Sequence, residues 1–144
     1  MASDSYHPDK LFSIEQANAM LPLVRAITTD MVELARDIAE RRHRLQAVGR
    51  DKRSRDMYGE ELAQIEEELE NDERRLREYV HELVNLGLEP KSAVDGLIDF
   101  PCEMDGRIVY LCWKLGEPEL LYFHELADGF LGRQPLVAGS VSNE

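Results

Sequence analysis

The sequence lacks the features that mark several large classes of protein. Its two cysteines are not spaced as a CxxC pair. No secretory signal is recognisable, and no apolar run reaches the about 20 residues that span a bilayer. We therefore expect a protein of the reducing cytoplasm without a membrane segment. The motifs GxxxxGKS/T, GxGxxG, GxSxG and HExxH are also missing, so no common nucleotide, esterase or zinc-protease site is indicated and no cofactor follows.

Basic residues are scarce, because 17 Lys and Arg stand against 29 Asp and Glu. The net charge of -12 repels phosphate, so nucleic acids and anionic membranes are not expected partners. The segment 41–55 is the exception, since Arg and Lys are concentrated there. It predicts either a solvated surface or a local contact with phosphate or with an acidic protein.

The sequence does have the length and apolar content of a single domain, with 144 residues of which 43% are hydrophobic. We place this domain at residues 12–136 and expect disordered tails at 1–11 and 137–144. Two segments repeat apolar residues every seven positions, as in a coiled coil. The rows include Ile14, Ala17, Leu21, Val24, Ile38 and Leu45 in the first segment and Leu62, Leu69, Leu76 and Leu83 in the second.

The repeats predict a long helical hairpin over residues 14–86. Ser13 and Gln16 have the spacing of a capping box, which indicates where the first helix begins. Pro22 has no amide hydrogen for an interior helical hydrogen bond. We therefore expect it to separate a short helix from a long one that ends near Val48.

A polar connector, residues 49–56, leads to a second long helix from about Met57 to Leu86. Because this connector is short, the two helices should lie antiparallel. Asp72 falls among the leucines of the seam, where a polar residue pairs with a cation or sets the register. The outer flanks of a two-helix hairpin stay exposed, so we expect a homo-oligomer and allow for another protein partner. The alternative is a hairpin that packs only on its own sheet.

The third part of the domain, residues 93–125, is rich in β-branched and aromatic residues. It predicts a three-stranded antiparallel meander with strands at 97–103, 107–115 and 119–125. Asp105-Gly106 is a strong signal for a two-residue hairpin turn. Residues 127–136 are expected to be irregular. The fold class is therefore α+β, a helical hairpin followed by a β-meander.

The turn at Asp105-Gly106 also sorts the side chains of the meander between its two faces. It places Phe100 opposite Leu111 on an apolar face, which we expect to pack on the helices. Cys102 lies on that face and Cys112 on the other, so an intramolecular disulfide is not expected.

The opposite face gathers residues that carry chemistry. Asp99 and Cys112 pair directly, and His124 lies diagonally from Cys112. Glu117, in the following turn, and Arg133, in the tail, can complete a pocket. A thiol beside an imidazole can become a thiolate, which is a nucleophile or a soft metal ligand. The alternative is a half-buried sheet face that the tail covers, with His124 bonded to a neighbour.

Several segments of the chain are similar to one known family. They are residues 12–22 (FSIEQANAMLP), 96–101 (GLIDFP) and 106–113 (GRIVYLCW), together with Gly116-Glu117, His124 and 129–134 (GFLGRQ). The chain resembles the prokaryotic family called domain of unknown function 2203 over about residues 11–136. Phe123 departs from the tryptophan that this family leads us to expect there. The resemblance implies the organisation of the domain and no reaction.

These observations lead to two functional hypotheses. The first is a noncatalytic, oligomeric interaction or scaffold module, because the helices dominate and no complete catalytic set is present. The alternative is an enzyme or a binder of a metal or small ligand that works at Asp99, Cys112 and His124.

Overall fold

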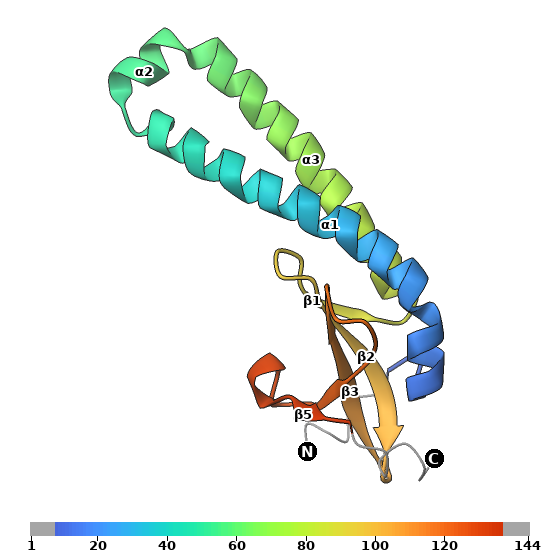
Figure 1. Ribbon diagram of the computed structural model, residues 1–144. Helices are drawn as coiled ribbons and strands as arrows, with labels where there is room; N and C mark the ends of the chain where they lie inside the picture. Colours follow the sequence, from blue (N-terminus) through green and yellow to red (C-terminus); the bar gives the residue numbers. More distant parts are fainter. Residues whose placement is uncertain (1–7, 137–144) are drawn as a thin grey trace.

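The computed structural model describes residues 8–136 as a helical hairpin joined to an antiparallel sheet (Figure 1). The helices are α1 (Ile14–Gly49), α2 (Lys52–Met57), α3 (Gly59–Asn85) and the 3-10 helix η2 (Phe130–Gly132). The strands are β1 (Glu89–Ser92), β2 (Leu97–Met104), β3 (Arg107–Lys114), β4 (Tyr122–Glu125) and β5 (Gln134–Pro135), which lie in this order across the sheet. The α+β prediction is confirmed, but the sheet has five strands rather than three. Of the tails expected at 1–11 and 137–144, residues 1–7 and 137–144 lie outside the described residues.

Helix α1 begins at Ile14, as the capping box predicts. The Ser13 hydroxyl accepts a hydrogen bond from the Gln16 N–H at 3.0 Å, and the Gln16 side chain accepts one from the Ser13 N–H at 2.9 Å. These two bonds satisfy backbone donors that the first turn of a helix leaves unpaired.

The predicted break at Pro22 is wrong, because α1 continues through this residue to Gly49. A proline inside a helix costs about 3 kcal/mol. Leu21 and Val24, on either side of Pro22, are both buried in the core that α1 shares with the sheet. Burying one such side chain contributes about 1.5–3 kcal/mol, so packing outweighs the lost hydrogen bond.

Helices α1 and α3 run antiparallel, as predicted (Figure 1). The connector between them is not simply polar coil, because it contains the short helix α2, whose first turn is capped by the Asp51 carboxylate. Asp72 pairs with Arg41 across the seam, and Arg42 pairs with Glu73 at 2.8 Å. The polar seam position thus finds a cation on the facing helix.

The register of the central hairpin is confirmed along its whole length. Phe100 lies opposite Leu111 and Asp99 opposite Cys112. Asp105 and Gly106 have φ values of 53° and 80°, as a two-residue type I′ turn requires.

The third predicted strand begins later than expected, at Tyr122 rather than residue 119. The Leu120 N–H donates to the Asn18 side-chain oxygen of α1 at 2.8 Å, so this backbone donor is used by the helix instead of the sheet. Beyond it, β4 pairs with β3 in the predicted register, with Phe123 opposite Leu111.

Two strands were not predicted. β1 pairs with β2 at one edge of the sheet, and β5 pairs with β4 at the other. Each contains a proline and little apolar character, so neither shows the alternation by which strands are recognised. Proline is tolerated at these positions because they lie at sheet edges.

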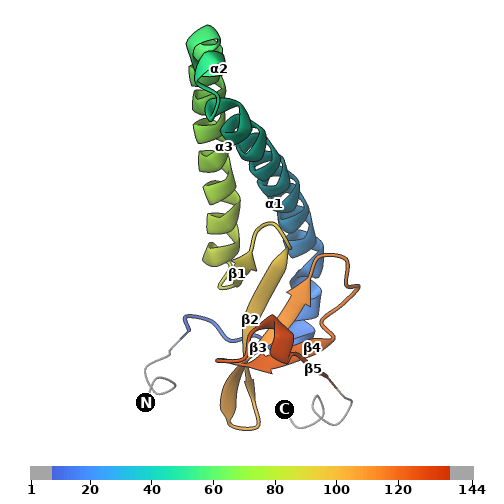
Figure 2. The ribbon, with the colours of Figure 1, turned by 90° about the vertical axis from the view of Figure 1, so that its left-hand side faces the viewer.

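The sheet packs one face on the hairpin, as expected. Fully buried side chains on this face include Ile98, Phe100, Leu111 and Trp113, which form one core with α1 and the end of α3. Figure 2 shows the segment of η2 and β5 in front of β3, with the first turns of α1 behind the sheet. The polar face is therefore covered by the chain that follows β4. Within residues 8–136, no helix combines the length and apolarity that a membrane crossing demands.

Candidate metal centre

Three polar side chains from three neighbouring strands meet on the covered face of the sheet. Asp99 comes from β2, Cys112 from β3 and His124 from β4, and their exposed fractions are 2%, 1% and 2%. One donor atom from each lies within 4.8 Å of the others. The alternation of side chains along the strands explains the grouping, since all three positions point to the same side.

The hydrogen bonds of His124 define how its protons are arranged. Its Nδ1 lies 2.8 Å from the carbonyl oxygen of Glu125, and its Nε2 lies 3.0 Å from Asp99 Oδ2. A carbonyl oxygen only accepts, so Nδ1 carries a proton. The contact with Asp99 then holds one further proton between Nε2 and the carboxylate. The pair is neutral overall in either arrangement.

Burial shapes the acidity of the other two groups. It raises the pKa of Asp99, against the opposing effects of His124 and Lys91. Burial, and next the charge of Asp99, raise the pKa of Cys112 to about 12, although Arg133 acts in the opposite direction. The surrounding protein groups therefore keep Cys112 as a thiol at neutral pH. The thiolate that we expected from a thiol beside an imidazole therefore needs a further positive charge at the site.

A cavity of about 260 Å³ lies beside the three donors. Its walls include Leu97 and Tyr110 from the sheet and Leu126, Ala127 and Phe130 from the covering segment. The covering segment thus shields the cluster from bulk water and still leaves room for a small molecule. The polar sheet face is neither an open surface nor a filled core.

Strand β1 supplies Lys91, which lines this cavity, and Glu89, which contacts Lys91 and Tyr110. The Tyr110 hydroxyl donates to the Glu89 carboxylate at 2.9 Å. The Lys91 ammonium lies 2.9 Å from Glu89 and 4.8 Å from the centre of the Tyr110 ring. Sequence reasoning missed Glu89 and Lys91 because it placed no strand there. Their alternation in Glu89-Pro90-Lys91 is too short a signal to identify an edge strand.

Glu117 and Arg133, which were predicted to complete the pocket, do not line the cavity, but Arg133 is close enough to Cys112 to lower the pKa of its thiol. They pair with each other at 2.8 Å. The Arg133 guanidinium also lies 4.1 Å from the ring centres of both Tyr122 and Phe130. This arrangement fastens the covering segment to β4, so the two residues position the lid of the cavity.

Both cysteines are buried, and they lie on opposite faces of the sheet, as predicted. Cys102 belongs to the apolar core, whereas Cys112 lines the cavity. The two thiols therefore provide a natural comparison, since they share a β-hairpin and differ in their neighbours.

The comparisons with known proteins identify a family but no reaction. No curated protein and no solved structure shows significant similarity to the chain. Residues 10–136 match the family described as uncharacterized conserved protein (DUF2203), which covers nearly the whole described domain. The chain therefore belongs to the DUF2203 family.

Proposed function

We propose that this protein binds a divalent metal ion of the zinc class through Asp99, Cys112 and His124. The adjoining cavity then holds a small ligand at the remaining coordination position. The observation that carries the proposal is the buried group of three different donor atoms within 4.8 Å. A carboxylate, a thiolate and an imidazole are all ligands of zinc in proteins.

The charge of the site favours a divalent ion. Without metal, the thiol is neutral and the Asp99–His124 pair is neutral as a whole. Metal binding removes about two protons, one from Cys112 and one from the pair, and leaves two negative charges. An ion of charge +2 restores neutrality, which matters because an unbalanced charge is costly in a buried site.

The hydrogen bond from His124 Nδ1 supports the same assignment. A metal-binding histidine donates its other N–H to a carbonyl or carboxylate, which holds the ring in place. Here Nδ1 donates to the Glu125 carbonyl, so Nε2 is the nitrogen directed at Asp99 and at the site. The ring is thus oriented for ligation before the metal arrives.

Three protein ligands leave a position for water or for a ligand, as in catalytic rather than structural zinc sites. The cavity that adjoins this position is lined mainly by apolar and aromatic side chains. Lys91 is neutralised by Glu89. We therefore propose a ligand of small size with an apolar body and one donor atom for the metal.

Cobalt binding to the full-length chain, freed of metal with a chelator, tests the proposal. We expect one Co²⁺ per chain with a thiolate-to-cobalt absorption band. Cys112→Ser should abolish the band, and Cys102→Ser should leave it unchanged. Absence of binding at about 100 µM Co²⁺, or a band that survives in Cys112→Ser, contradicts the proposal.

A second candidate function is the noncatalytic, oligomeric scaffold module. It is supported by the length of the hairpin that extends beyond the sheet (Figure 1). Cys102 and Cys112 lie on opposite faces of the sheet and cannot bond to each other, which accords with the cytoplasmic location that we propose for either function. Sedimentation of the purified chain tests the scaffold, because a monomer at all concentrations argues against it.

A further inference from the structure

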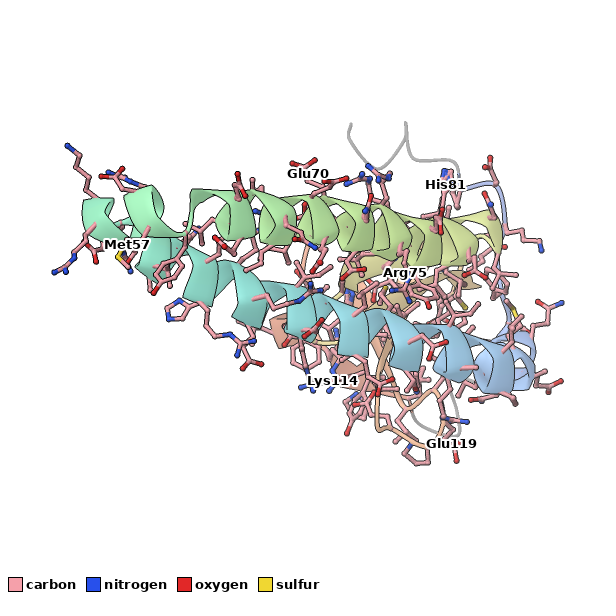
Figure 3. All side chains as sticks on the ribbon, turned by 90° about the horizontal axis from the view of Figure 1, so that it is seen from above. Met57, Glu70, Arg75, His81, Lys114 and Glu119 are labelled. Carbon is pink, nitrogen blue, oxygen red and sulfur yellow. The ribbon has the colours of Figure 1, made fainter. Side chains whose placement is uncertain are left out.

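The outer part of the hairpin, residues 40–68, forms the distal hairpin. The core that the helices share with the sheet extends along α1 only to Met31, and along α3 it begins at Leu76. Figure 3 shows the hairpin projecting past the sheet, with Met57 at the far end from His81. The sheet therefore does not account for the apolar side chains of the distal hairpin.

A groove of about 340 Å³ runs between the two helices of the distal hairpin. Its apolar lining consists of Leu45, Val48, Leu62 and Ile65. The side chains of Val48 and Ile65 are 40% and 38% exposed. Apolar side chains grouped in this way on the surface of a soluble chain indicate an interaction site.

The two walls of this groove carry opposite charges. Arg41 and Arg44 line it from α1, and Glu68 lines it from α3. Arg41 already pairs with Asp72 and Asp37, whereas the ion pair of Arg44 among residues 8–136 is a long one, at 3.9 Å from Glu40. Glu68 forms no ion pair within the described part of the chain. Arg44 and Glu68 are therefore available to a partner.

We propose that a second copy of the chain covers this groove and forms a homodimer. A two-fold axis along the groove sets α1 of each copy against α3 of the other. The basic wall of one copy then faces the acidic wall of its partner, so the surface is self-complementary, as a two-fold interface must be. Neighbouring helices in the resulting four-helix bundle are antiparallel, which is a common packing.

The charges also distinguish this partner from a nucleic acid. Phosphate would meet the acidic wall of the groove as well as the basic one, and the whole chain carries a charge of -12. The larger cavity of about 510 Å³ that Arg42 and Glu66 line is less suited to a partner, since these two residues already pair across it. The groove of Val48 and Ile65 is therefore the dimer surface.

This proposal is independent of the metal site, with which it shares no residue, and it gives the scaffold candidate its partner. Sedimentation equilibrium of the full-length chain tests it. We expect a dimer, and we expect R44E and E68R each to raise the dimer dissociation constant at least about tenfold, because like charges then face each other. The double variant R44E/E68R exchanges the two walls and should return the constant to within about threefold of the original.

Glu70→Arg is the matched control, because it makes the same charge change on the same helix at an exposed position outside the groove. It should leave the dissociation constant unchanged, and circular dichroism should show equal helix content in all variants. A chain that remains monomeric at about 100 µM overturns the proposal, whether or not it binds nucleic acid. So does a dimer that E70R weakens as much as E68R, or that the double variant does not restore.

Discussion

The sheet end buries polar side chains, whereas the distal hairpin exposes apolar ones. At the sheet end, Asp99 and His124 are 2% exposed and bonded to each other. In the distal hairpin, Val48 and Met57 are 40% and 61% exposed, while the ion pairs lie near the surface. Buried polar groups need hydrogen-bond partners inside the molecule, whereas apolar groups clustered on the surface can be removed from water by a partner. The sheet end therefore has the character of an internal binding site, and the distal hairpin that of an interaction surface.

The largest expected difference between the two regions concerns their apolar side chains. Phe100→Ala removes a ring that is 0% exposed and should lower the free energy of unfolding by about 3–5 kcal/mol. Ile65→Ala, at a side chain that is 38% exposed, should cost less than about 1.5 kcal/mol. Urea unfolding of both variants measures the two losses of unfolding free energy. Equal losses would mean that the distal hairpin is as well packed as the sheet.

The next difference concerns charged pairs. Asp99→Ala leaves His124 buried without its partner and should cost about 3 kcal/mol at pH 7. Glu73→Ala breaks the half-exposed pair with Arg42 and should cost about 0.2–1 kcal/mol. Thermal unfolding of the two variants under the same conditions gives the comparison. A smaller loss for Asp99→Ala than for Glu73→Ala would contradict it.

Metal binding should then stabilise the sheet end specifically. Zinc at 100 times its dissociation constant should raise the free energy of unfolding by about 2.7 kcal/mol. Hydrogen exchange should show the added protection in β2, β3 and β4. Cys112→Ser should lose the effect and Cys102→Ser should keep it. Protection confined to the hairpin would place the ion elsewhere.

The smallest effect is the response of the hairpin to acid. The Arg41 guanidinium lowers the pKa of the Asp72 carboxyl from its usual value, and that of Arg42 lowers the pKa of Glu73. The folded chain therefore binds fewer protons than the unfolded chain near pH 4, so this stabilisation is complete above about pH 5 and is lost as the pH falls. Asp99 acts in the opposite sense, because burial raises its pKa.

The double variant D72N/E73Q tests this effect. Its melting temperature should change less between about pH 5 and pH 2 than that of the original chain. A pH profile that is unchanged by the two substitutions would show that the surface pairs of the hairpin contribute nothing measurable.

The parts of the fold that depend on neighbouring residues could be predicted. The capping residues Ser13 and Gln16 set the start of α1, and the turn at Asp105-Gly106 set the register of the central strands. That register alone assigned Asp99 and Cys112 to one face and Cys102 to the other. Such signals are reliable because the bonds involved are local.

The parts that depend on distant contacts were missed or misplaced. Pro22 was expected to separate a short helix from a long one, but α1 continues through it because residues on both sides are buried in the core. Strand β4 begins later than predicted because the Leu120 N–H donates to the side chain of Asn18, which is 102 positions away in the sequence. Strand β1 was not predicted because its own residues show no strand pattern, and its extended structure depends on pairing with β2.

The amino-acid sequence by itself determined the hairpin, the central strands and the face on which Asp99, Cys112 and His124 stand, since helical and strand periodicities are properties of the local chain. That a covering segment buries these three side chains and leaves a cavity beside them follows from contacts between distant parts of the chain. The same holds for the ion pair between Glu117 and Arg133, which fastens this segment outside the cavity. The physical reason is that burial, and with it the acidity of Cys112 and Asp99, depends on every segment that excludes water from the site.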